Sequence, residues 1–153
     1  DKYIIGLNKR GEPMPPRQQI PAHAFHDGEI GAGSRVDLIA ISYPWLSREH
    51  PDPERFHLST LAPLLKAYHK KRGCSTVVFL DFMSLFQGER TADQAELFTL
   101  GLRAINLIYG QQHVQVWCLT RVPPALLRSG ANTDPRRPEP RCVSLRRAVL
   151  AMR

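Results

Sequence analysis

Polar and aromatic side chains suited to binding or catalysis gather directly after two short apolar runs of the sequence, residues 36–41 and 76–80. If these runs are parallel strands of an open sheet, their carboxyl ends form the edge at which such sheets bind ligands. The sequence therefore places a candidate site there. Its candidate ligand-binding residues are Ser42, Tyr43, Trp45, Asp81, Gln87, Glu89 and Arg90.

Asp81 is the most informative of these residues, because a carboxylate that follows an apolar strand is partly removed from water and needs a partner. Arg48, Arg90 and the hydroxyl of Ser42 are the partners that the sequence offers. The carboxylate can bind a ribose hydroxyl or a cation, or it can cap its own loop, which the turn preference of aspartate favours. Trp45 can stack on a base or cover the sheet edge, and aromatic burial favours the cover.

Other catalytic patterns are weak in this sequence. Ser42 lacks the glycines of a nucleophile elbow. His23 and His26 lie in a Gly/Pro-rich segment without a rigid scaffold, so we predict no metal site. Gly31 and Gly33 precede a strand instead of opening a helix, so they form no phosphate loop. We accordingly predict no cofactor.

The elements that would position the candidate site alternate between strand and helix. Strands are predicted at 36–41, 76–80 and 114–119, and helices at 60–72 and 91–110. The second helix begins with a capping-box pattern and is apolar over most of its girth, so we expect it to be mostly buried. Right-handed crossovers then require a parallel sheet in an α/β fold.

The two ends of the chain differ from this middle part. Residues 1–35 are rich in proline and glycine, which predicts an extended arm with an edge strand at 2–7. Residues 36–120 form the α/β domain, and 121–153 form a loop and a last helix at 141–152. Most of the net charge of +7 lies in the last part. Its arginines favour an acidic protein surface or RNA, and the predicted partner-binding residues are Arg136, Arg137, Arg141, Arg146 and Arg147.

Cysteine usage and hydropathy restrict the environment of the protein. The three cysteines, Cys74, Cys118 and Cys142, are odd in number and widely spaced, which argues against a disulfide framework or a zinc site. Apolar neighbours predict that Cys74 and Cys118 are buried, reduced thiols in a reducing, intracellular compartment. No run approaches the roughly 18 apolar residues of a membrane span.

Three blocks of the sequence, in order, resemble the HET (heterokaryon-incompatibility) domain and TIR-like domains. They are residues 37–45, which end in Ser-Tyr-Pro-Trp, residues 77–87, which contain Asp81 and Gln87, and Glu96 with the segment from Ile108 to the strand at 114. The resemblance covers residues 36–120. It implies a flavodoxin-like, TIR-like three-layer fold and a role in self-association or in death and stress signalling.

Some TIR domains also cleave NAD with a glutamate in a Trp-Cys-x-x-Glu segment. Arg141 and Leu145 stand at the corresponding Trp and Glu positions here. The leading hypothesis is therefore a non-catalytic interaction or structural subunit of a larger assembly. The first alternative is a nucleotide glycohydrolase that uses Ser42, Asp81 and Glu96, and the second is an RNA-associated protein that uses the basic C-terminus.

Overall fold

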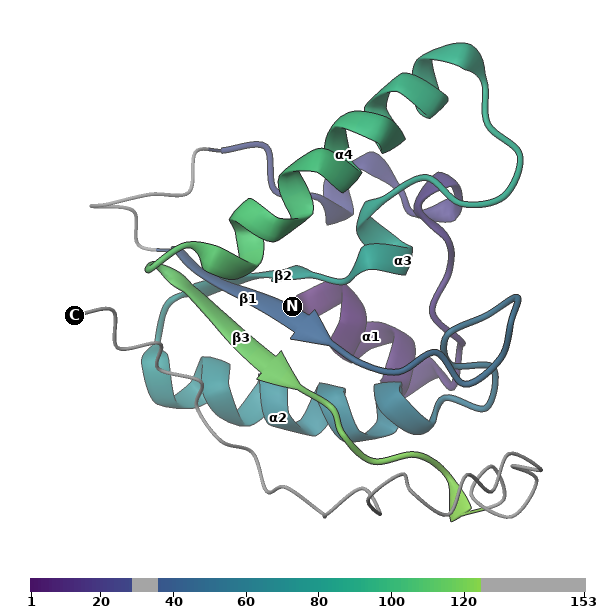
Figure 1. Ribbon diagram of the computed structural model, residues 1–153. Helices are drawn as coiled ribbons and strands as arrows, with labels where there is room; N and C mark the ends of the chain where they lie inside the picture. Colours follow the sequence, from purple (N-terminus) through teal and green to yellow (C-terminus); the bar gives the residue numbers. More distant parts are fainter. Residues whose placement is uncertain (29–35, 125–153) are drawn as a thin grey trace, which may run out of the picture.

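A computed structural model describes residues 1–28 and 36–124 of the protein and shows a parallel sheet between helices (Figure 1). The strands are β1 (Val36–Ser42), β2 (Ser75–Phe79) and β3 (Val114–Cys118), and their order is β2-β1-β3. Both pairings are parallel, with Leu38 opposite Val77 on one side and Val114 on the other. The predicted α/β class, the three strands and their direction are confirmed.

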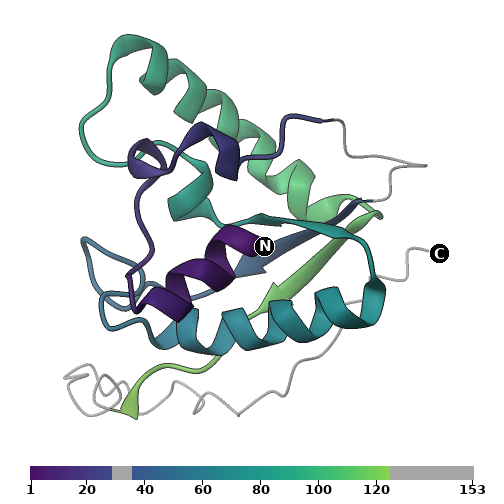
Figure 2. The ribbon, with the colours of Figure 1, turned by 180° about the vertical axis from the view of Figure 1, so that it is seen from behind.

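Helices cover both faces of the sheet, as Figures 1 and 2 show. Helix α2 (Phe56–Arg72) connects β1 to β2 and lies on one face beside α1 (Lys2–Arg10). Helix α4 (Ala92–Gly110) connects β2 to β3 on the other face, and the short α3 (Asp81–Ser84) precedes it. The core between β1, α1 and α2 contains fully or almost fully buried aliphatic side chains, among them Ile4, Leu7, Ile39, Ile41, Leu58, Leu61 and Leu65.

The beginnings and ends of the two long helices have clear local causes. Thr91 caps α4, and its hydroxyl and the side chain of Gln94 form the predicted capping box. Helix α2 begins at Phe56, earlier than the predicted Thr60, because Asp52 caps it from within the preceding loop. It ends at Arg72, because the following Gly73 has a φ of 66°, in the left-handed region that glycine adopts without strain.

The N-terminal segment differs from the prediction, because residues 2–7 belong to helix α1 and form no edge strand. Asp1 caps this helix through its side chain, and Ile4 and Leu7, three residues apart, both enter the core. Two 3-10 turns, η1 (Arg17–Gln19) and η2 (Ala22–Ala24), follow. Met14 and Ile20 are buried, so residues 11–28 pack against the sheet and its helices instead of extending away as an arm.

Helix α4 is far more exposed than the prediction of a mostly buried helix. None of its residues is buried, and Leu97, Leu100, Leu102 and Leu107 have exposed fractions of 55, 51, 46 and 66%. The prediction of burial rested on the apolar composition of the helix alone. The sheet has only three strands in the described residues, which is too narrow to cover α4 on all its apolar sides, so one flank of the helix stays exposed.

The prediction that Cys74 and Cys118 are buried is wrong for Cys118 and is met only in part at Cys74. Cys118 is exposed at the end of β3, whereas Cys74 is half-buried and donates a hydrogen bond to Asp37; both are free thiols. Cys142, the helix predicted at 141–152 and the partner-binding arginines lie outside the described residues. Among the helices that are described, none has the length and apolar composition to cross a membrane.

Candidate functional site

The polar residues that follow β1 and β2 meet at one edge of the sheet, as the parallel arrangement requires. Tyr43 donates its hydroxyl hydrogen to Asp81 Oδ1 over 2.5 Å, and the indole nitrogen of Trp45 lies 3.4 Å from Asp81 Oδ2. The backbone N–H of Phe82 donates to Oδ1 over 2.7 Å. The structure thus brings together Tyr43, Trp45 and Asp81, which we call the rim cluster.

The partners predicted for Asp81 were wrong. Its carboxylate is bound by Tyr43 and Trp45, and within the described chain neither Arg48, Arg90 nor the Ser42 side chain has a hydrogen bond to it. Arg90 turns away, donates to the Phe86 carbonyl over 2.9 Å and stacks on Phe98 at 3.8 Å. Ser42 is exposed, and its carbonyl accepts from Leu119 on the β3 side.

Gln87 lies next to the rim cluster and connects it to the N-terminal segment. Its side-chain amide donates to the carbonyls of Leu85, at 2.8 Å, and Asp81, at 3.4 Å. Its backbone N–H donates to the side-chain oxygen of Gln18 over 3.1 Å, and the Gln18 amide donates to the Gln87 carbonyl. The side chains of Glu89 and Glu96 are exposed and have no hydrogen bond among the described residues. The structure therefore places Gln87 beside the rim cluster and brings neither glutamate to it.

Beneath the rim cluster lies a polar layer that sequence reasoning missed. The fully buried carboxylate of Asp52 accepts from the backbone N–H groups of His57, at 3.0 Å, and Leu58, at 2.8 Å. His50 Nδ1 accepts from the Asp52 N–H over 2.9 Å, so its proton resides on Nε2 and is donated to the Met14 carbonyl at 3.0 Å. These bonds fix the β1–α2 loop against the N-terminal segment.

Aromatic rings join this polar layer to the rim cluster. Phe82 meets Trp45 edge-to-face at 5.7 Å and His50 at 4.8 Å, and Tyr43 meets the buried His57 at 5.5 Å. An aspartate shortly before an apolar helix is a candidate capping residue, and this is the signal that could have pointed to Asp52, although Arg55 occupies the N-cap position itself. The aromatic contacts depend on tertiary packing and have no such signal.

The electrostatics of the rim cluster favour a structural role for it. Burial and, secondarily, the negative charge of Asp81 raise the pKa of Tyr43 far above its usual range. Tyr43 therefore stays protonated and acts as a fixed donor. Since the Asp81 carboxylate accepts hydrogen bonds from three groups, it holds the loops after β1 and β2 together, and Trp45 remains 42% exposed beside it.

A second polar cluster lies at the opposite end of the sheet, around Asp37 near the start of β1. Its carboxylate accepts from the Tyr68 hydroxyl at 2.7 Å, from Arg72 Nε at 3.0 Å and from Cys74 Sγ at 3.2 Å. Gln115 of β3 donates to the same Tyr68 hydroxyl. The cluster joins β1 to the end of α2 and to β3.

The hydrogen bond from Arg72, with help from Tyr68 and Cys74, lowers the pKa of Asp37 from 3.8 to about 2. A carboxyl with a depressed folded-state pKa stabilises the protein above its unfolded-state pKa, and this contribution disappears as the pH falls from about 4 to about 2. Asp37→Asn is therefore expected to lower the free energy of unfolding at pH 6 and to flatten its fall in this acid range. Urea titrations across the range measure both effects.

Glu89→Gln is the control for this prediction, because Glu89 is exposed and has no hydrogen bond in the described chain. It should reproduce the wild-type acid profile. If Asp37→Asn also follows the wild-type profile, the Asp37 cluster does not contribute to the stability of the folded state.

Comparison with protein-family models, with curated proteins and with solved structures finds no match. Within residues 1–28 and 36–124, no group of three or more His, Cys, Asp or Glu side chains is arranged to hold a metal ion. The fold and the site together define the protein as an α/β protein with a parallel sheet of strand order β2-β1-β3 and with the rim cluster at the carboxyl ends of β1 and β2. Its function has to be argued from the geometry of this chain.

Proposed function

We propose that this protein is a non-catalytic TIR/HET-like association module with a flavodoxin-type fold. The strand order β2-β1-β3, with successive crossover helices on opposite faces, supports the fold because doubly wound sheets of flavodoxin type begin in that order. The meeting of Tyr43, Trp45 and Asp81 supports the kinship, because two of the resembling sequence blocks supply these residues.

The exposed leucines of α4 are the observation that carries the proposal. Leu97, Leu100 and Leu107 lie at steps of three and seven residues, so they share one flank of the helix, which we call the leucine flank. Leu107 also borders a hollow of about 280 Å³ beside the start of β3. Exposed leucines gathered on one flank of a helix are typical of a protein–protein contact.

A second copy of this chain is the partner that the leucine flank fits. Glu96 and Arg103 are exposed seven residues apart and lie on the polar stripe beside the flank. When two α4 helices pack antiparallel, Glu96 of each copy faces Arg103 of the other, and the leucines meet between them. The charges of Glu96 and Arg103 are thus self-complementary across the contact, as a two-fold interface requires.

Leu100→Lys tests the association. We expect the full wild-type chain to dimerise and Leu100→Lys to raise the dissociation constant by about tenfold or more, since a leucine contributes roughly 1.5–3 kcal/mol on burial and a charge opposes it. Sedimentation velocity over a concentration series measures the change.

Leu102→Lys is the matched control, because Leu102 is similarly exposed but lies on the opposite flank of α4. It should leave dimerisation unchanged. In addition, Glu96→Arg should weaken the dimer, and adding Arg103→Glu should restore it. A wild-type chain that is monomeric at every concentration contradicts the proposal, as does equal weakening by both lysine variants.

The glycohydrolase alternative receives less support from the geometry. Asp81 is occupied by Tyr43, Trp45 and the Phe82 N–H, and in the described residues no hydrogen bond links Ser42 or Glu96 to it. The arginines of the RNA alternative lie outside the described residues.

A further inference from the structure

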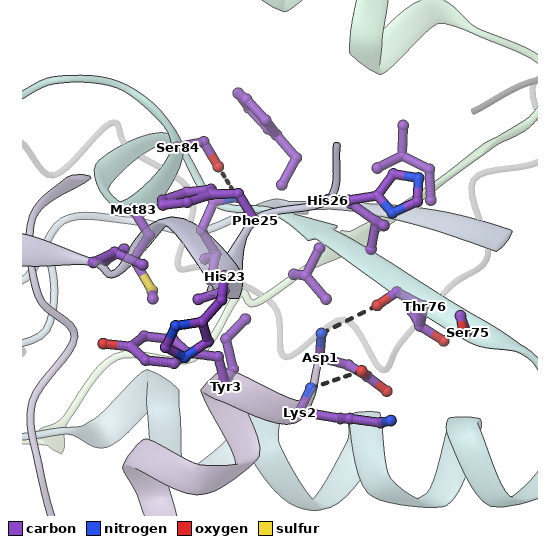
Figure 3. A pocket seen from close by; sticks show the side chains of 18 of the residues that line it. Asp1, Lys2, Tyr3, His23, Phe25, His26, Ser75, Thr76, Met83 and Ser84 are labelled. Carbon is purple, nitrogen blue, oxygen red and sulfur yellow. Dashed lines mark hydrogen bonds between the residues drawn. The ribbon is translucent and has the colours of Figure 1, made fainter. Parts of the chain in front are cut away.

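Strand β2 forms an outer edge of the sheet, and a groove runs beside this edge. The groove encloses about 790 Å³ and is lined by β2, the first residues of α1, the η2 segment and Ile108 of α4. Figure 3 looks into it: Phe25 and His26 lie above, Asp1, Lys2 and Tyr3 lie below, and Thr76 belongs to the strand between them. Apolar side chains such as Ile20, Phe25 and Met83 contribute much of the wall.

The even-numbered residues of β2 turn their backbone groups away from β1. The Thr76 carbonyl accepts from the Asp1 nitrogen at 3.1 Å, and the Leu80 N–H donates to Ser84 Oγ at 3.2 Å, both outside the sheet. The same alternation holds in β1. The Ser42 carbonyl accepts from Leu119, so the backbone groups of the even-numbered residues of β1 point to the β3 side and those of the odd-numbered residues point to β2. The N–H and C=O of Val78 therefore point out of the sheet as well.

Val78 is the position on this edge whose outward backbone groups have no partner in the described chain. Thr76 and Leu80, on either side of it, each have an outward group bound. A backbone N–H and C=O that are partly removed from water are best matched by the C=O and N–H of another extended backbone. Thr76 is 5% exposed as a residue, and its buried hydroxyl also lacks a hydrogen-bond partner among the described residues.

We infer that the groove beside β2 binds an extended peptide segment of a partner protein, which pairs with Val78 as an added strand. The groove accommodates an apolar side chain of the peptide. Among the described lining residues, Lys2 supplies the exposed charge, because the Asp1 carboxylate is buried 3.1 Å from His69 Nδ1. The peptide therefore carries an acidic residue near its apolar one.

This inference can be tested apart from dimerisation, because none of Leu97, Leu100 and Leu107 lines the groove, although Ile108 of the same helix does. The monomeric Leu100→Lys variant should therefore bind the same peptides as the wild-type chain. A loss of dimerisation and a loss of peptide binding can be observed separately.

The experiment selects random peptides displayed on phage against the full chain, and then measures the affinity of the enriched peptides by fluorescence polarisation. Enriched sequences are expected to combine apolar and acidic residues. In isotope-labelled protein, the bound peptide should slow amide hydrogen exchange at Val78 by about tenfold or more, while the amide of Val77, which faces β1, should change little.

Val78→Pro removes the outward donor at an edge position where proline is tolerated, and it should weaken peptide binding by about tenfold. Val78→Thr keeps the donor and nearly the same shape, so it should bind like the wild type. The exchange measurement on wild-type protein decides the matter if Val78→Pro does not fold. Failure to enrich any peptide, or protection on α4 or at the rim cluster instead of at Val78, would overturn the inference.

Discussion

Asp52→Ala is expected to lower the free energy of unfolding by about 3 kcal/mol, because the variant loses an N-terminal helix cap and leaves buried donors unpaired. The wild-type carboxylate is fully buried and accepts from the N–H groups of His57 and Leu58 in the first turn of α2. Alanine offers neither acceptor nor negative charge to the positive end of the helix. Urea unfolding followed by circular dichroism measures the loss.

Two controls separate capping from loss of volume or charge. Asp52→Asn retains one side-chain oxygen, so it can serve one of the two N–H groups and should lose roughly half as much stability. Glu54→Ala removes an exposed carboxylate from the same loop and should change stability by less than about 0.5 kcal/mol. If Asp52→Ala costs no more than Glu54→Ala, water or another group satisfies the helix and the cap has no energetic role.

Local sequence patterns were sufficient to predict the framework of the sheet. The apolar runs at 36–41, 76–80 and 114–119 each form a strand, because each is too short for a helix and is separated from the next by a helix-length segment. The capping box at Thr91 and Gln94 located the start of α4 to the residue, since its signal lies within one turn. Parallel pairing then followed from the handedness of crossovers.

The predictions were wrong where the structure of a short segment, or the burial of a helix, is decided by the elements that pack against it. Tyr3, Ile4 and Ile5 have strong strand propensity, but burying Ile4 and Leu7 against α2 requires a helical spacing, and this packing decides the structure. The exposure of α4 was missed for a related reason. Its composition indicates an apolar helix, but whether such a helix is covered depends on how many strands and helices the sheet provides beside it.

The candidate site divides in the same way. Tyr43, Trp45 and Asp81 could be placed together because the carboxyl ends of neighbouring parallel strands share an edge. The hydrogen-bond partner of Asp81 could not be predicted, because the segments after the two strands contain arginine, serine and tyrosine side chains that could all contact it. Packing decides it: Phe98 and the Phe86 carbonyl retain Arg90, while His57 holds the Tyr43 ring beside the carboxylate.

The pairing of Tyr43 with Asp81 should dominate the stability of the rim cluster. Asp81→Ala is expected to lower the free energy of unfolding by about 2–3 kcal/mol, because it leaves the Tyr43 hydroxyl and the Phe82 N–H without their acceptor. Tyr43→Phe should cost about 1–1.5 kcal/mol, since Asp81 keeps its bonds to Trp45 and Phe82. Urea unfolding of both single variants and of the double variant measures the coupling between them.

A double-mutant cycle of this kind distinguishes a structural carboxylate from one held ready for a ligand. If the hydrogen bond stabilises the fold, the double variant is more stable than the sum of the single losses predicts, by about 1–2 kcal/mol. Ser42→Ala, at an exposed neighbour whose side chain has no hydrogen bond among the described residues, should cost less than about 0.5 kcal/mol. A coupling near zero, with single variants as stable as Ser42→Ala, means that Asp81 does not stabilise the fold. The rim would then have to be reconsidered as a binding site that places a carboxylate beside the exposed Trp45.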